Sequence, residues 1–63
     1  MSPLTYSRFL NFLQEELSLS TNSIAMAERS VKENSGLLPI VLWQYGLVTL
    51  QDLDKIYDWL ESS

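Results

Sequence analysis

A nine-residue pattern occurs twice in the chain and constrains its fold more than any other feature of the sequence. The copies are Leu19-Ser20-x-x-x-Ile24-x-x-Ala27 and Val48-Thr49-x-x-x-Leu53-x-x-Ile56, with matching positions 29 residues apart (48 − 19 = 29). Each copy is typical of a helix start, in which a Ser or Thr caps the first turn and the apolar residue before it packs four positions into the helix. This pseudo-repeat predicts two helical hairpins, at about 3–34 and 37–61, that fold as one small all-α domain over residues 1–63.

Helix-start and helix-stop signals divide the chain into four helices. Ser2, Ser20 and Thr49 are suited to cap helix starts, and the last of these has Asp52 three residues on as a partial capping box. Asn and Gly tolerate the left-handed conformation that closes a helix, and they occur at the expected ends, in Asn34-Ser35-Gly36 and at Gly46. The expected helices cover residues 3–16 or 17, 21–33, 37–45 and 50–61.

The third expected helix is apolar on nearly every side. Its main apolar arc comprises Leu37, Leu38, Val41, Leu42 and Tyr45. Ile40 and Trp43 lie opposite this arc at about 100° per residue. The pattern therefore favours a central, buried helix, and two interpretations of Ile40 and Trp43 stay open. Either neighbouring helices cover them, or they belong to an exposed patch.

Four large apolar residues lie outside the core stripes of their helices or at the edge of a stripe. They are Phe12, Ile40, Trp43 and Trp59. Aromatic residues in excess of those that a small core needs are typical of interface anchors. We therefore predict that these four residues form one partner-binding patch, and that at least one of the two tryptophans is partly exposed.

The charge balance excludes several classes of partner. Eight acidic residues against four basic ones give a net charge of −4, which opposes nucleic acid and anionic lipid. The longest apolar run, 37–43, is far shorter than the ~20 residues of a membrane span. The first five residues show neither the charged nor the long apolar region of a signal peptide. We expect a cytoplasmic protein that binds neither nucleic acid nor membrane.

The sequence shows no catalytic or metal-binding constellation. There is no Cys and no His, so disulfides and the usual zinc sites are excluded. Asp54, Asp58 and Glu61 recur on one outward face of the fourth helix, as expected of a solvated amphipathic surface. No His is present to activate a Ser or Thr nucleophile, and nothing buries Lys32 or Lys55. We expect a non-enzymatic protein with no catalytic residues, metal or cofactor.

Two segments carry a resemblance to a known family. They are residues 38–60, LPIVLWQYGLVTLQDLDKIYDWL, and residues 12–17, FLQEEL. Together they resemble a family of short, functionally uncharacterised cyanobacterial proteins, and the similarity extends over almost the whole chain. The resemblance implies a cyanobacterial origin.

A second resemblance concerns the N-terminal helical domain of type II secretion and pilus-assembly ATPases. Some members bind cyclic di-GMP through paired motifs that read Arg-Leu-Gly-x-x-Leu, then Gly-Leu-Ile-Thr, then Gln-Leu. The matching runs here are Arg8-Phe9-Leu10-x-x-Leu13, Leu38-Pro39-x-x-Leu42 and Gly46-Leu47-Val48-Thr49. Leu10 and Pro39 stand where the family has glycine. The resemblance implies the helical frame, with Arg8 as the retained ligand contact of a degenerate motif.

Two functions follow as hypotheses. The first is a regulatory or adaptor module that docks another protein, or a second copy of itself as a homodimer, through the predicted patch, while acidic residues steer a basic partner. The second is a small-ligand sensor that binds a cyclic dinucleotide between the two halves through Arg8.

Overall fold

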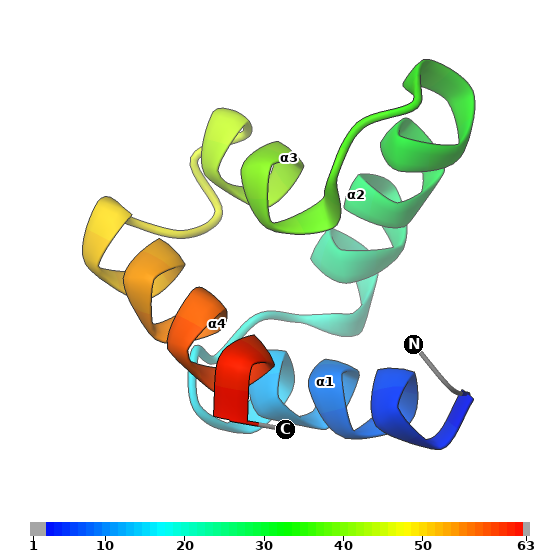
Figure 1. The fold of residues 1–63 in the computed structure, drawn as a ribbon. Helices are drawn as coiled ribbons and strands as arrows, with labels where there is room; N and C mark the ends of the chain where they lie inside the picture. The colour runs from blue at the N-terminus through cyan, green and yellow to red at the C-terminus, as the bar shows by residue number, and fades with distance from the viewer. Residues whose placement is uncertain (1–2, 63) are drawn as a thin grey trace.

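Four α-helices arranged around one core make up the regular structure of residues 3–62, the part of the chain that the computed structural model describes (Figure 1). They are α1 (Pro3–Glu15), α2 (Thr21–Asn34), α3 (Leu38–Gln44) and α4 (Leu50–Ser62). Successive helices follow one another around a ring, so that α4 returns to lie beside α1. Within residues 3–62 there is no strand, and the predicted all-α, four-helix class is confirmed.

The start of α4 is fixed by a reciprocal pair of hydrogen bonds. The backbone N–H of Asp52 donates to Thr49 Oγ1 at 3.0 Å, and the backbone N–H of Thr49 donates to Asp52 Oδ2 at 3.2 Å. Two of the donors that a helix start leaves unpaired are thereby satisfied. The negative Asp52 also lies in the first turn, where it interacts favourably with the helix dipole.

The ends of α2 combine a confirmed prediction with a correction. Ser20 caps the start as predicted, because its hydroxyl accepts a hydrogen bond from the Ser23 backbone N–H at 3.1 Å. At the other end Asn34 is still helical, and Ser35 has the left-handed conformation, with φ 57°. Gly36 instead allows the backbone to pack closely against Val41, because a Cβ at position 36 would lie only 3.0 Å from Val41 Cγ2. At the end of α2, the prediction that Asn34 or Gly36 takes the left-handed conformation is therefore wrong.

The first helix ends at Glu15, slightly earlier than predicted. Ser18 then takes a left-handed conformation with φ 57°, and the Leu19 N–H donates back to the Leu13 carbonyl at 3.1 Å. This reversal lets Leu19 enter the core directly before the Ser20 cap. The predicted cap at Ser2 lies outside the described residues.

The end of α3 forms a Schellman motif around Gly46. The Leu47 N–H donates to the Leu42 carbonyl and the Gly46 N–H donates to the Trp43 carbonyl, both at 2.9 Å. Gly46 has φ 73°, and an added Cβ would find no atom within 4 Å. Its role is thus conformational, as predicted, and it sets the direction in which the chain leaves for α4.

In the described part of the chain, nine buried apolar side chains form one core. They are Phe9, Leu13, Leu19, Ile24, Ala27, Val41, Leu42, Val48 and Ile56. The apolar positions that match in the two copies of the sequence pattern are buried in both, except that Leu53 is only half-buried. Leu13 and Leu42, also 29 residues apart (42 − 13 = 29), are both fully buried. The assignment of the helices to two repeated hairpins stays a prediction.

The expectation of a buried third helix is wrong. Val41 and Leu42 are buried against the core, but Leu37 is 68% exposed and Tyr45 is 49% exposed, although both were placed in the inner arc. The neighbouring helices α2 and α4 contact α3, and they cover one side of it. A chain of 63 residues cannot enclose a helix on every side because its core is too small.

We predict that Gly46→Ala lowers the free energy of unfolding by about 1–2 kcal/mol, because a Cβ is strained in the left-handed conformation. Gly46→Asn should cost less, since Asn tolerates this region. Urea unfolding followed by circular dichroism measures both values. Equal stability of the wild type and the Ala variant would contradict the Schellman assignment.

Candidate functional site

Trp59 joins the last helix to the first through two ring contacts. Its indole lies 5.5 Å from the Phe12 ring, with an interplanar angle of 22°, and 5.6 Å from the Phe9 ring, with an angle of 42°. Phe9 is buried, whereas Phe12 and Trp59 are half-buried and packed against the core. Phe12, which lies outside the core stripe of α1, therefore contributes to the contact between α1 and α4.

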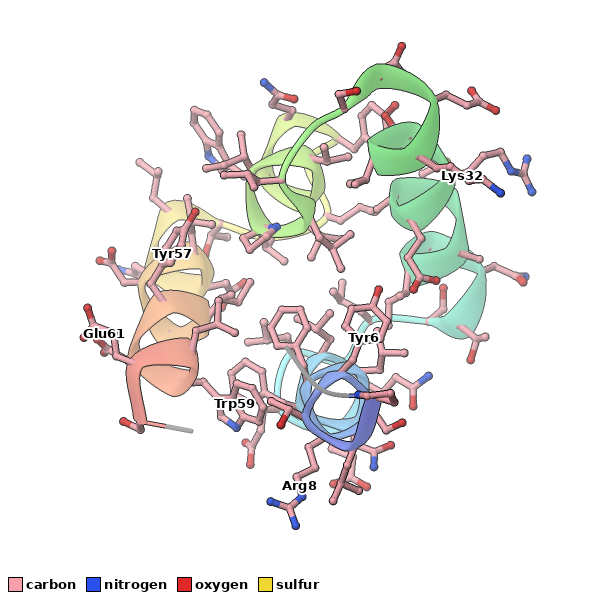
Figure 2. All side chains as sticks on the ribbon, turned by 45° about the vertical axis from the view of Figure 1, so that its right-hand side comes forward. Tyr6, Arg8, Lys32, Tyr57, Trp59 and Glu61 are labelled. Atoms are coloured by element: carbon pink, nitrogen blue, oxygen red, sulfur yellow. The ribbon has the colours of Figure 1, made fainter. Side chains whose placement is uncertain are left out.

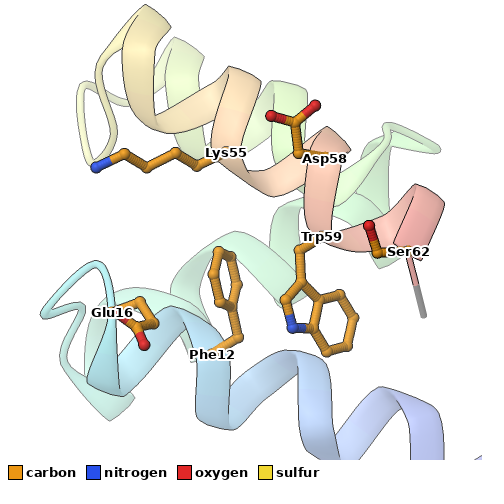
Figure 3. A pocket seen from close by; sticks show the side chains of 6 residues that line it. All are labelled: Phe12, Glu16, Lys55, Asp58, Trp59 and Ser62. Atoms are coloured by element: carbon orange, nitrogen blue, oxygen red, sulfur yellow. The ribbon is translucent and has the colours of Figure 1, made fainter.

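An open pocket of about 440 Å³ lies between α1 and α4 beside this stack (Figure 3). Its lining consists of Phe12, Glu16, Lys55, Asp58, Trp59 and Ser62. The two rings project into the space between the helices, whereas the Asp58 carboxylate points away from both rings. Two acids against one lysine give the pocket a negative balance, which favours cationic over anionic ligands.

Arg8 is exposed on α1, where it points away from the body of the protein (Figure 2). It precedes Phe12 by four residues, so that the two side chains lie within about 40° of each other around the helix. Arg8 is not among the residues that line the pocket. The acids Glu16 and Asp58, which line the pocket, would repel the phosphates of a dinucleotide bound there.

The outward side of α3 presents a second apolar surface. Trp43 is 42% exposed and Ile40 is half-buried, so the interpretation in which neighbouring helices cover Trp43 is wrong. Leu37 precedes Ile40 by three residues, as Ile40 precedes Trp43, and it is exposed as well. We call Leu37, Ile40 and Trp43 the α3 face. Sequence reasoning missed Leu37, although the three-residue spacing could have revealed it.

The four residues predicted to bind a partner thus occupy two places. Phe12 and Trp59 stack on each other between α1 and α4, and Ile40 and Trp43 belong to the α3 face. The expectation that at least one Trp is partly exposed is confirmed by Trp43. That the four make one continuous patch, and that they bind a partner, stays a prediction.

Three acidic residues of α4 lie on its solvent side. Asp54, Asp58 and Glu61 are all exposed, and Glu61 and Tyr57 point outward from the same side of the helix (Figure 2). Within residues 3–62 no group of three acidic, His or Cys side chains is placed to hold a metal ion. These carboxylates therefore act in the structure as a solvated helix face.

A hydrogen bond between α1 and α2 was not foreseen from the sequence. The Tyr6 hydroxyl donates to Glu28 Oε2, across 22 positions of the chain. Burial, together with this hydrogen bond and the Glu28 charge, raises the pKa of the Tyr6 phenol from 10.0 to about 12. No local signal marks such a pair, because it depends on how the two helices are oriented.

Comparison with known proteins adds a family to these observations. Residues 6–61 match the model of a family described as "Protein of unknown function (DUF2949)". The chain belongs to this family. The match covers all of α2, α3 and α4 up to Glu61, and it includes both the aromatic stack and the α3 face.

Searches among curated proteins and among solved structures find no significant match. Among the described residues, no helix combines the length and the apolar character that crossing a membrane requires.

The raised pKa of Tyr6 predicts a loss of stability at high pH. The protonated phenol is favoured in the folded state, so its contribution is complete below pH 10.0 and is lost as the pH approaches about 12. Tyr6→Phe should cost about 1 kcal/mol at neutral pH. It should also reduce the decline of stability between these two pH values.

Urea unfolding of the wild type and of Tyr6→Phe at several pH values measures this difference. Tyr57→Phe is the matched control, because it removes a hydroxyl from an exposed tyrosine on α4. It should follow the wild-type profile. If the stability of Tyr6→Phe declines with pH as steeply as that of the wild type, the coupling to Glu28 is absent.

Proposed function

We propose that the chain is a non-enzymatic interaction module that docks another protein through the α3 face. The observation that carries this proposal is the 42% exposure of Trp43 on a helix segment, 38–44, that contains no charged residue. An exposed Trp on an uncharged helix surface is the kind of residue that supplies much of the binding energy in protein interfaces.

The α3 face is rigidly supported from behind. Val41 and Leu42 anchor the opposite side of the helix in the core, and the Schellman motif at Gly46 fixes its end. The partner would therefore meet a preformed surface, which lowers the entropy cost of binding. Leu37 extends the surface by one turn before Ile40.

The charge of the chain favours a basic partner. The net charge is −4, and the exposed carboxylates of Asp54, Asp58 and Glu61 lie on α4, one of the helices that contact α3. Such charges accelerate the encounter with a positively charged protein and contribute less to the final affinity. We further propose a cytoplasmic location and a cyanobacterial origin, which rest on the composition and on the sequence resemblance.

The cyclic-dinucleotide hypothesis has less support. Arg8 is available on the surface, but Leu10 is half-buried and Pro39 lies in the first turn of α3, where the related motifs have glycine. Calorimetric titration with cyclic di-GMP tests this alternative directly. Heat of binding that Arg8→Ala abolishes would establish it in place of docking through the α3 face.

Trp43→Ala should weaken partner binding by about 30-fold, the equivalent of about 2 kcal/mol for an interface anchor. The partner is first captured by cross-linking in native extract, and its affinity is then measured with purified proteins. Met26→Ala is the control, since it truncates an exposed apolar residue on α2. Unchanged affinity of Trp43→Ala, with its circular dichroism preserved, would rule out docking through the α3 face.

A further inference from the structure

Arg8, Phe12 and Glu16 form a charge pattern that is complementary to itself. They follow one another at intervals of four residues, with Arg8 and Phe12 on one side of α1 and Glu16 directly after its last residue. The positive charge thus precedes the aromatic ring along the chain, and the negative charge follows it. Glu16 continues this turn, because its N–H donates to the Phe12 carbonyl at 2.9 Å. Both charged side chains are exposed.

We propose that this side of α1, together with the pocket beside it, is an interface with a second copy of the chain. When two α1 helices pack antiparallel about Phe12, position 8 of each copy faces position 16 of the other, since both are four residues from the centre. Arg8 of each copy then pairs with Glu16 of the other. A two-fold arrangement makes both ion pairs at once.

The pocket is suited to receive the incoming arginine. A guanidinium can pair with a carboxylate and stack on an aromatic ring, and the pocket offers the Glu16 carboxylate together with the Phe12 and Trp59 rings. Lys55 also lines the pocket, but its amine points away from Trp59 (Figure 3). The pocket thus has space and charge for the Arg8 side chain of a second copy.

Self-association also suits the size of the protein. Within residues 3–62 the core consists of nine buried side chains, and small domains of this kind often gain stability from oligomerisation. The interface lies on α1 and α4 and does not use the α3 face. It therefore stands independently of the proposed docking function.

Charge reversal at the two positions tests the interface. In the Arg8→Glu dimer, an acid at position 8 faces the acid at position 16 at each end of the interface. In the Glu16→Arg dimer, two bases face each other in the same way. Each change should raise the dimer dissociation constant by about tenfold or more. Sedimentation equilibrium over a concentration series up to the millimolar range, at low salt, measures the constant. Circular dichroism verifies that the variants fold.

Restoring opposite charges across the interface is a more decisive test than removing them. An equimolar mixture of Arg8→Glu and Glu16→Arg should form a heterodimer, because position 8 of each chain then faces an opposite charge at position 16 of the other. The double variant should recover the homodimer for the same reason. Arg29→Glu is the matched control, since it makes the same charge change on α2 and should leave the constant unaltered.

Three results would overturn the proposal. They are a wild-type chain that stays monomeric throughout the series, a mixture that does not associate, and an effect of Arg29→Glu as large as that of Arg8→Glu. Trp43→Ala should leave self-association unchanged while it weakens docking through the α3 face. Failure of one proposal is therefore distinguishable from failure of the other.

Discussion

The contact of Trp59 with Phe9 and Phe12 closes the fold. It joins the last helix to the first, and the ring of four helices depends on it because α1 and α4 are far apart in the chain. Aromatic pairs of this kind contribute about 0.5–1.5 kcal/mol each beyond the apolar area that they bury. In a domain with a core of nine side chains, such a contribution is a large part of the net stability.

Closing the ring in this way produces both surfaces of interest. The stack leaves Phe12 and Trp59 half-buried, so that they line a pocket together with Glu16 and Asp58. The other surface arises because α3 packs against α2 and α4 with one side only, and Trp43 remains on the solvent side. The limited core thus determines which aromatic residues support the fold and which are available to a partner.

Local features of the structure could be predicted from the sequence, and contacts between helices could not. The cap at Thr49 and the turn at Gly46 form between residues a few positions apart, so their signals lie within short segments. The hydrogen bond of Tyr6 and the stacking of Phe12 on Trp59 depend on helix orientation, which periodicity does not encode. The apolar pattern overestimated the burial of α3. Such a pattern reports how hydrophobic a helix is, but it does not report how many neighbouring helices cover it.

A nuclear Overhauser spectrum of the aromatic side chains tests the closure of the ring most directly. The structure predicts cross-peaks from the Trp59 indole protons to the ring protons of both Phe9 and Phe12, whose ring centres lie 5.6 and 5.5 Å away. Selective labelling of phenylalanine separates these signals from those of Trp43. A folded protein in which Trp59 shows no cross-peak to either phenylalanine would contradict the contact between α1 and α4, and with it the pocket.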